Sequence, residues 1–406
     1  MRRLAWPLVL SMAVVTACQE SPLATDSEPQ APLAAVRGQE RKIDVIVVLD
    51  AAFAPGGHRA NQSRAGEVAR GLGVAPTFTY GTALYGFAGS IPEGRLRALE
   101  NDPKVLYVER DGIASIPRPG PSGLCDKKHD HPKCQPSGGD PPEEPTTETE
   151  PWGIARVGGP VNATGETGTA WIIDTGIDLD HRDLNVDVNR SKNFVSGRGK
   201  KANSPEDGNG HGTHVAGTVA AIDNSIDVVG VAAGATVVAV RVLGNSGSGT
   251  ISGVIAGVDY VAATGSDGDV ANMSLTGYGD YESLNNAVKS AADIGIMFSL
   301  AAGNDGDNAD NYSPARLNYP GVYTVSAMNS SSCLASWSNY GNPPVDYAAP
   351  GVSILSTKRG GGTTTMSGTS MAAPHVAGLL LLKHLNSKGN VPCGDTDGTP
   401  DKIAHY

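Results

Sequence analysis

Short runs of apolar residues alternate with longer segments of helical spacing between residues 152 and 386. The runs predict strands that are buried on both faces, and the longer segments predict helices. The expected strands are 169–173, 236–242, 270–275, 296–301 and 322–327, and the expected helices are 212–221, 252–263, 284–294 and 371–385. We therefore predict an α/β fold of three layers, in which a mostly parallel sheet has helices on both faces. Active sites of such folds lie outside the C-terminal ends of the strands.

A second, smaller pattern comes before this one. Its expected strands are 42–49, 78–80, 85–91 and 105–109, and its expected helices are 61–72 and 92–101. The order β-α-β-β-α-β predicts a small α+β unit of the ferredoxin-like kind, which we place at residues 42–115.

Two segments lack both periodicity and a useful number of apolar residues. Residues 19–41 are rich in Pro, Ala, Ser and Glu, and residues 116–150 are rich in Pro, Gly, Ser, Glu and Thr. Neither composition can bury enough apolar surface to fold by itself. We therefore expect a flexible tether at 19–41, a linker at 116–150 and one large domain at 151–406.

The N-terminus predicts export. Arg2 and Arg3 precede an apolar run at residues 4–17, which is short for a membrane span, and Cys18 follows it directly. A small residue before a cysteine at the end of such a run resembles the signal of a bacterial lipoprotein, in which the cysteine carries the lipid. A simple secretory peptide with an incidental cysteine is the alternative. Both interpretations make residues 1–18 a signal and place the mature protein outside the cytoplasm, either secreted or in the cell envelope.

The charge of the chain excludes one class of function. The formal net charge is -11 at pH 7, and no basic cluster occurs. Nucleic acids are bound through positively charged surfaces, so a nucleic-acid partner is not expected. We read the acidity as solubility outside the cell.

The cysteines predict disulfides, because export leads to an oxidising compartment. If Cys18 carries a lipid, four of the five cysteines remain, and four cysteines allow three connectivities among which the sequence does not choose. Cys125 and Cys134 lie close together in the linker, so we expect them to pair, which leaves Cys333 and Cys393 for a second bridge. The histidines between Cys125 and Cys134 also allow a zinc site, which we consider the weaker hypothesis.

Three short motifs hold candidate catalytic side chains, in the order Asp, His, Ser. Asp174 ends a predicted buried strand, where its carboxylate can hold the tautomer of a neighbouring imidazole. His211 stands between two glycines, which let the backbone come close to its ring. Ser370 begins a predicted helix, where its own N–H and the helix dipole can bind developing negative charge. Each motif by itself has a structural alternative, such as a capping Asp, an N-cap Ser, or a metal pair of His211 with His214.

A fourth motif adds a donor for an oxyanion. Asn304 follows Ala-Ala-Gly at the end of a predicted strand. A side-chain N–H at such a place stabilises a tetrahedral intermediate by about 3–4 kcal/mol in the transition state. The four motifs together predict nucleophilic catalysis by a serine, with an imidazole base and an oxyanion donor.

Taken together, these motifs resemble those of the subtilisin-like serine peptidases, whose chain order is also Asp, His, Ser. The resemblance covers about residues 152–385 and is nearest to the proteinase K and aqualysin branch, on stretches such as 151–156, 311–315 and 337–341. It implies a serine endopeptidase that works through an acyl-enzyme and needs no cofactor for catalysis. It also implies that an extended substrate pairs between two strand edges. The residues implied in substrate binding are Ser274, Leu275, Thr276 and Gly277 on one edge, Gly247, Ser248 and Gly249 on the other, and Ala301 and Gly303 in the S1 pocket. Thr276 stands where the family usually has Gly. The resemblance therefore does not determine the shape or the specificity of the S1 pocket.

The resemblance implies further partners as well. Proteins and peptides would be the substrates, and a monomer is the family's usual state. A structural calcium ion would be held by Asp346 and by the carbonyls of Pro320 and Val322, since oxygen ligands suit Ca²⁺. The acidic residues Asp178, Asp180, Asp183 and Asp187 could form another cation site, although a solvated loop explains them better.

Residues 42–115 resemble the family's inhibitory propeptide, on residues 85–90 and 99–111. In the family this domain assists folding and then blocks the cleft with its C-terminal tail until self-cleavage. The linker at 116–150 is longer than usual and does not place the self-cleavage site. The competing hypothesis is a catalytically silent surface binding protein on the same fold, but it requires a lost catalytic residue, and all four are intact.

Overall fold

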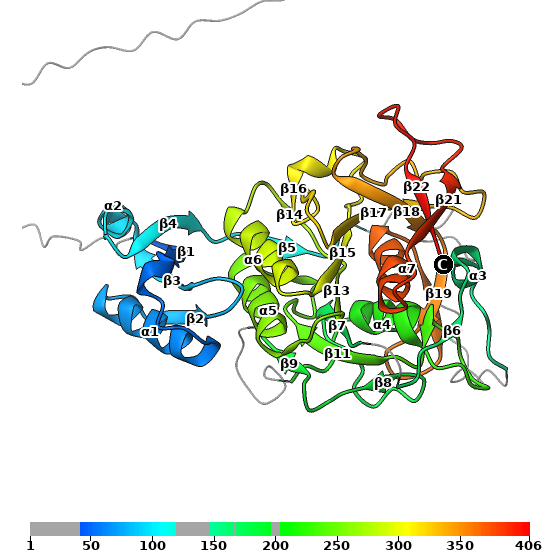
Figure 1. The fold of residues 1–406 in the computed structure, drawn as a ribbon, viewed down its shortest axis with the longest axis horizontal. Coiled ribbons are helices and arrows are strands. Elements are labelled where there is room, and N and C mark those ends of the chain that lie inside the picture. The colour runs from blue at the N-terminus through cyan, green and yellow to red at the C-terminus, as the bar shows by residue number, and fades with distance from the viewer. Residues whose placement is uncertain (1–40, 119–146, 166–167, 196–203) are drawn as a thin grey trace, which may run out of the picture. The chain divides into compact units, whose positions relative to one another are not determined.

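The structure is a computed structural model that describes residues 41–118, 147–165, 168–195 and 204–406. A large sheet crosses its main part in the order β21-β22-β18-β17-β15-β13-β7-β11-β8, and β9 also pairs with β11 (Figure 1). Only the edge pair β21–β22 is antiparallel. The central strands are β7 (Ala170–Asp174), β11 (Thr236–Arg241), β13 (Val270–Met273), β15 (Met297–Ala301), β17 (Val322–Met328) and β18 (Val345–Pro350).

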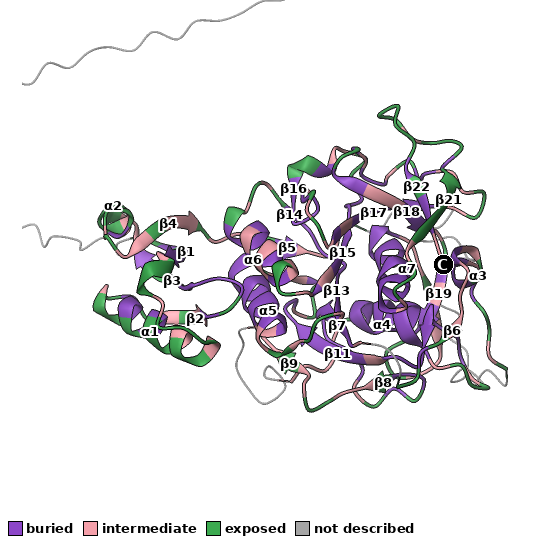
Figure 2. Ribbon diagram, in the orientation of Figure 1, coloured by how far each residue is buried: buried purple, intermediate pink, exposed green. Residues whose placement is uncertain are grey.

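Alternate residues of each central strand supply two cores, one on either face of the sheet, because successive side chains of a strand point in opposite directions. Trp171 and Ile173 pack in the core that holds α5 (Ile251–Thr264) and α6 (Glu282–Asp293). Ala170 and Ile172 pack in the core that holds α4 (His211–Ala220) and α7 (Thr369–Leu381). All residues of α4 and α7 are buried (Figure 2). The predicted three-layer α/β fold is therefore confirmed.

Short elements complete the larger part of the chain. They are α3 (Trp152–Val157), β6 (Val161–Asn162), β8 (Asn185–Val186), β9 (Lys192–Asn193), β10 (Ala232–Ala233), β12 (Ser248–Thr250), β14 (Gly277–Tyr278), β16 (Tyr312–Ser313), β19 (Ile354–Thr357) and β20 (Thr363–Met366). No helix within the described ranges has both the length and the apolar character to cross a membrane.

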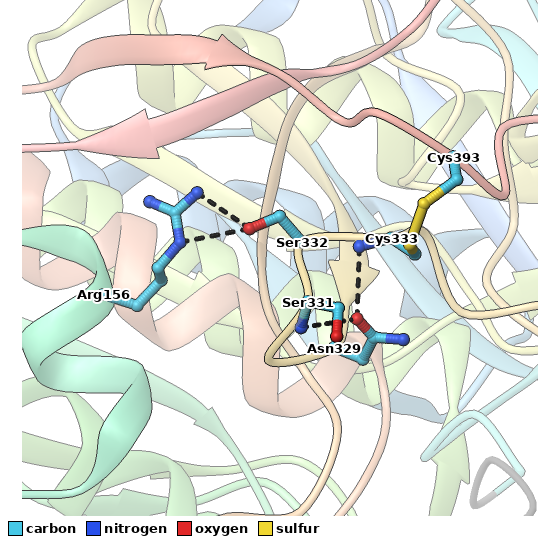
Figure 3. The surroundings of a disulfide bond; sticks show 6 residues. All are labelled: Arg156, Asn329, Ser331, Ser332, Cys333 and Cys393. Atoms are coloured by element: carbon cyan, nitrogen blue, oxygen red, sulfur yellow. Dashed lines mark hydrogen bonds between the residues drawn. A yellow bond between two sulfur atoms is a disulfide. The ribbon is translucent and has the colours of Figure 1, made fainter.

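The C-terminal hairpin, β21 (Asn386–Asn390) and β22 (Lys402–His405), was not predicted. Every residue of β21 is exposed, so this strand has no apolar pattern to detect. A disulfide between Cys333 and Cys393 ties the loop inside the hairpin to the loop after β17 (Figure 3). Cys18, Cys125 and Cys134 lie outside the described residues, and with them the lipid, the bridge expected between Cys125 and Cys134, and the zinc alternative.

The small unit has the predicted order of elements. Its sheet runs β2-β3-β1-β4, and the elements are β1 (Lys42–Leu49), α1 (His58–Gly71), β2 (Pro76–Tyr80), β3 (Gly86–Pro92), α2 (Leu96–Glu100) and β4 (Val105–Arg110). The prediction that a helix starts at Pro92 is wrong. Pro92 has an extended backbone and pairs with Lys42 as the last residue of β3, and a 3₁₀ turn separates it from α2.

The two faces of the small sheet have different neighbours. Val45 and Val47 pack in a core with α1. Ile46 and Val48 pack in the core that also contains α5 and α6 of the larger part. The chain then leaves β4 and forms β5 (Ile113–Ser115), which pairs with β12. This connection brings residues 113–118 to the ends of the central strands.

Candidate active site

Asp174 and His211 meet where the sheet ends. Asp174 is the last residue of β7 and His211 is the first residue of α4. The Nδ1 atom of His211 lies 2.8 Å from Oδ1 and 3.0 Å from Oδ2 of Asp174, and both residues are buried. Gly212 makes this contact possible, because a Cβ at that position would lie 2.1 Å from the carbonyl oxygen of Gly176.

Asp207 holds the two loops of this pair together, and the sequence motifs did not reveal it. Its carboxylate accepts hydrogen bonds from the hydroxyls of Thr175 (2.9 Å) and Thr213 (2.7 Å) and from the backbone N–H of Gly210 (2.9 Å). Thr175 follows Asp174, and Gly210 precedes His211, so Asp207 fixes the chain on both sides of the pair. Its position only four residues before His211 is the one signal that could have drawn attention to it.

Ser370 is the second residue of α7 and is buried. Its hydroxyl donates to the carbonyl oxygen of Ser274 at 3.3 Å, and the hydroxyl of Ser274 donates back to the carbonyl of Ser370 at 2.9 Å. The Nε2 atom of His211 is buried and has no hydrogen-bond partner among the residues that the structure describes. Ser370 and His211 both line one cavity of about 250 Å³, and no hydrogen bond joins their side chains.

Asn304 presents an oriented N–H to the cavity. Its Oδ1 accepts from the backbone N–H and from the hydroxyl of Thr369, both at 2.8 Å. Because the oxygen is used in this way, the Nδ2 group must point the other way. It donates to the carbonyl oxygen of Arg118 at 2.7 Å. The sequence predicts that Asn304 donates to an oxyanion. In the structure its amide donates to a carbonyl oxygen, which is the group that becomes the oxyanion during acyl transfer.

The two predicted substrate edges flank residues 113–118. On one side Ser248 pairs with Ser115 and Gly249 pairs with Ala114. On the other side Ser115 exchanges both of its backbone hydrogen bonds with Thr276, at 2.9 and 3.0 Å. Residues 113–115 are therefore the middle strand of a small antiparallel sheet.

The remaining predicted substrate residues lie around this sheet. Gly277 belongs to β14, and the backbone carbonyl of Gly247 accepts from the N–H of Ile116 at 2.9 Å. The side chains of Leu275 and Ala301 are buried in the two cores. Gly303 has a φ of +110° and leaves no room for a side chain, since a Cβ would lie 2.2 Å from Asn339.

The acidic residues after β7 bind different partners. Asp178 accepts from the N–H of Gly360 at 2.6 Å, and Asp187 pairs with Arg190 at 2.7 Å. Asp183 is buried and accepts from Asn224, and burial raises the pKa of Asp183 to about 7. Within the described residues, no group of three or more acidic, histidine or cysteine side chains converges as a metal site.

Comparisons with known proteins agree with this site. A family model described as the subtilase family matches residues 171–392. A subtilisin-like serine protease of Sarocladium strictum is 41% identical over 322 residues, which cover 76% of this chain and 72% of that protein. Subtilisin NAT of Bacillus subtilis subsp. natto is 38% identical over 325 residues, which cover 78% of this chain and 74% of that protein. A crystal structure of a cold-adapted subtilisin-like serine proteinase matches with a TM-score of 0.52 at 40% identity, and covers 63% of this chain and 97% of that one.

The matched region is more than half of the chain and contains Asp174, His211, Asn304 and Ser370. The buried Asp–His pair, the adjacent serine and the oriented amide are the parts that acyl transfer by a serine enzyme requires. The chain therefore belongs to the subtilase family, and it is a serine endopeptidase.

Proposed function

We propose that this endopeptidase is exported, acts outside the cytoplasm, and is made as a precursor that inhibits itself and is activated by its own cleavage. Ser370 is the nucleophile, His211 the general base, Asp174 the residue that orients the base, and Asn304 the oxyanion donor. The observation that carries the proposal is the segment at residues 113–118, which lies between the two edges that would bind a substrate and puts a carbonyl on Asn304.

The chemistry follows from these positions. For attack, the Ser370 hydroxyl turns from the Ser274 carbonyl to Nε2 of His211 and gives up its proton there as the oxygen bonds to the substrate carbonyl carbon. Asn304 and the Ser370 N–H hold the oxyanion. His211 then protonates the leaving amine as the C–N bond breaks. A water molecule, deprotonated by His211, hydrolyses the acyl-enzyme and restores Ser370.

Residues 42–118 act as the intramolecular inhibitor in this proposal. Glu109 accepts hydrogen bonds from the backbone N–H groups of Glu282 (2.9 Å) and Ser283 (3.2 Å), at the N-terminus of α6. Asp111 accepts from the backbone N–H (3.0 Å) and the hydroxyl (2.5 Å) of Ser252, in the first turn of α5. Carboxylates at helix N-termini satisfy free N–H groups and the positive end of the dipole.

A third contact runs in the opposite direction. Asp259, which is buried on α5, accepts from the backbone N–H groups of Gly81, Thr82 and Ala83, at distances down to 2.7 Å. Burial raises the pKa of Asp259. Carboxylates of residues 42–118 thus accept hydrogen bonds from α5 and α6, and a carboxylate of α5 accepts from residues 81–83. These reciprocal contacts support a stable inhibitory complex.

The signal at residues 1–18 supports export, with Cys18 as the lipidation site of the precursor. The lipid and the catalytic domain lie on opposite sides of the inhibitor in the sequence, so self-cleavage would release the mature enzyme from its anchor. We also propose that the enzyme is a monomer. We place it in the proteinase K branch of the family, on residues 151–156, 311–315 and 337–341.

Labelling tests the assignment of the nucleophile. We expect a fluorophosphonate to modify Ser370 in the processed protein, because His211 and Asn304 activate that hydroxyl and stabilise the adduct. Mass spectrometry of tryptic peptides locates the label. Heat-unfolded protein is the control and should not react. Modification of another serine, or none in folded and processed protein, would contradict the proposal.

We also propose that Asp346, with the carbonyls of Pro320 and Val322, holds a structural calcium ion. From the described part of the chain, the Asp346 carboxylate accepts one hydrogen bond, from the N–H of Thr324 at 2.9 Å, and burial raises its pKa to about 6. A partly buried carboxylate with a free oxygen suits a cation. The ion would neutralise a charge whose burial otherwise opposes folding.

The calcium proposal predicts a pH-dependent effect on stability. A carboxyl whose pKa is raised from 3.8 to about 6 on folding costs stability as pH rises above 3.8, and the cost is complete above about pH 6. The test is made at pH 8, where Asp346 is charged. A ligand at one hundred times its Kd stabilises the folded state by about 2.7 kcal/mol, so calcium at that concentration should raise the free energy of unfolding of Ser370→Ala protein by this amount. Melting curves with calcium or a chelator measure this. Adding Asp346→Asn should abolish the gain and Asp310→Asn should keep it, and an equal gain in both would refute the site.

A further inference from the structure

The backbone pairing of residues 113–118 fixes which residue faces Ser274. Ala114 pairs with Gly249 and Ser115 pairs with Thr276, while the N–H of Ile116 donates to Gly247. In an antiparallel pair, moving two residues forward on one strand means moving two residues back on the other. Residue 117 therefore faces Ser274, two residues beyond the Ser115–Thr276 pair.

Residue 117 is a proline, and proline has no N–H. Any other residue at this position would donate its N–H to the Ser274 carbonyl and complete the pairing. In the structure that carbonyl accepts instead from the hydroxyl of Ser370, at 3.3 Å. The Ser370 hydroxyl thus takes the place of the missing N–H, and within the described ranges Nε2 of His211 has no hydrogen-bond partner.

Asn304, the proposed oxyanion donor, does not bind the residue that this register places opposite Ser274. Two hydrogen bonds join Ser274 to Ser370, so the residue that faces Ser274 is the one expected to present its carbonyl to Ser370. Asn304 holds the carbonyl of Arg118, which is the next residue along. The residue that faces Ser274 is therefore not the residue whose carbonyl Asn304 holds.

From these observations we infer that Pro117 makes residues 113–118 an inhibitor that binds like a substrate and that Ser370 does not cut where it is bound. The inference rests on the proposed function. Cleavage after residue 117 needs the nucleophile on His211 and the residue-117 carbonyl on Asn304, and proline prevents the pairing that would align both. Cleavage after Arg118 would have to expel the ring nitrogen of Pro119, from a tertiary amide. The precursor is consequently slow to process at this place, and Pro117 sets that rate.

The test compares processing of the full-length precursor and its Pro117→Ala and Pro117→Gly variants, each of which restores the N–H. We expect both variants to cut the bond between residues 117 and 118 about 100-fold faster than the wild type, the size of effect that small misplacements of reacting groups produce. Gel time courses give the rate, and mass spectrometry gives the new N-terminus, expected at Arg118. Pro103→Ala is the matched control, since Pro103 lies exposed in the turn before β4, and it should behave as the wild type.

Each outcome decides the inference. Rapid cutting of the wild type at either bond flanking Arg118 would overturn it, and so would folded Pro117 variants that remain uncut there. The same substitutions combined with Ser370→Ala show by their melting curves that the variants fold. Failure of the proposed function looks different, because wild-type protein would then fail to react with the fluorophosphonate wherever the chain is cut.

Discussion

Replacing Ser370 with Ala is expected to lower kcat for peptide hydrolysis by about 10⁶-fold, which is the loss measured when the nucleophile of a subtilisin is removed. Without the hydroxyl no acyl-enzyme forms, and only the Asn304 amide and the binding edges remain. The structure predicts little effect on folding, because the hydroxyl makes one long hydrogen bond, to the Ser274 carbonyl. The measurement is the initial rate on a chromogenic peptide. Another protease first removes the proposed inhibitor, residues 42–118, from the wild type and the variant.

Ser331→Ala is the control for this experiment. Ser331 is exposed in the loop beside the disulfide, far along the chain from the catalytic motifs (Figure 3). It should keep full activity, and Ser370→Ala should keep the wild-type melting temperature. A residual activity of Ser370→Ala within tenfold of the wild type would remove Ser370 from the mechanism.

Replacing Asp174 with Asn is expected to lower kcat by about 10⁴-fold. Oδ1 of Asp174 accepts from the backbone N–H of Thr175 at 2.6 Å and lies 2.8 Å from Nδ1 of His211, and the side chain is fully buried. An amide that keeps its oxygen on Thr175 has its NH₂ group at the position of Oδ2, which lies 3.0 Å from Nδ1 of His211. The imidazole then holds its proton on Nε2 and cannot accept the proton of Ser370.

The pH profile separates this effect from simple loss of structure. The activity of the Asp174→Asn enzyme should rise as the pH is raised, because hydroxide replaces the missing base. An unfolded protein would show no such rise. Asp180→Asn is the matched control, because Asp180 is exposed and only six residues away, and its kcat should be unchanged. A loss of less than tenfold in Asp174→Asn would mean that another group orients His211.

The core strands and the reactive residues could be predicted for a common reason. β7, β11, β13 and β15 are buried on both faces and therefore consist of apolar runs, which a sequence shows directly. Asp174 stands at the end of such a run. The glycines beside His211 allow contacts that any side chain would block, as at Gly212, so their positions in the sequence already indicate a close approach of two backbone segments.

The exposed elements could not be predicted in the same way. β21 has no buried residue, and α2 is a helix of one turn or so after a proline that belongs to a strand. Asp207 resembles any polar residue of a loop until the hydroxyls of Thr175 and Thr213 are seen on its carboxylate.

The sequence by itself predicted the α/β class, the order of the strands from β7 to β17 with their helices, and the four residues that we propose for the site, because local burial and local backbone geometry leave their trace in neighbouring residues. Only the tertiary structure decided how that site is occupied. Asp259 meets Gly81 across 178 positions of the chain, and Asn304 meets Arg118 across 186. Such contacts have no period and no motif. We propose that the pairing of residues 113–115 with the two edges, which puts Pro117 opposite Ser274, governs when the enzyme becomes active.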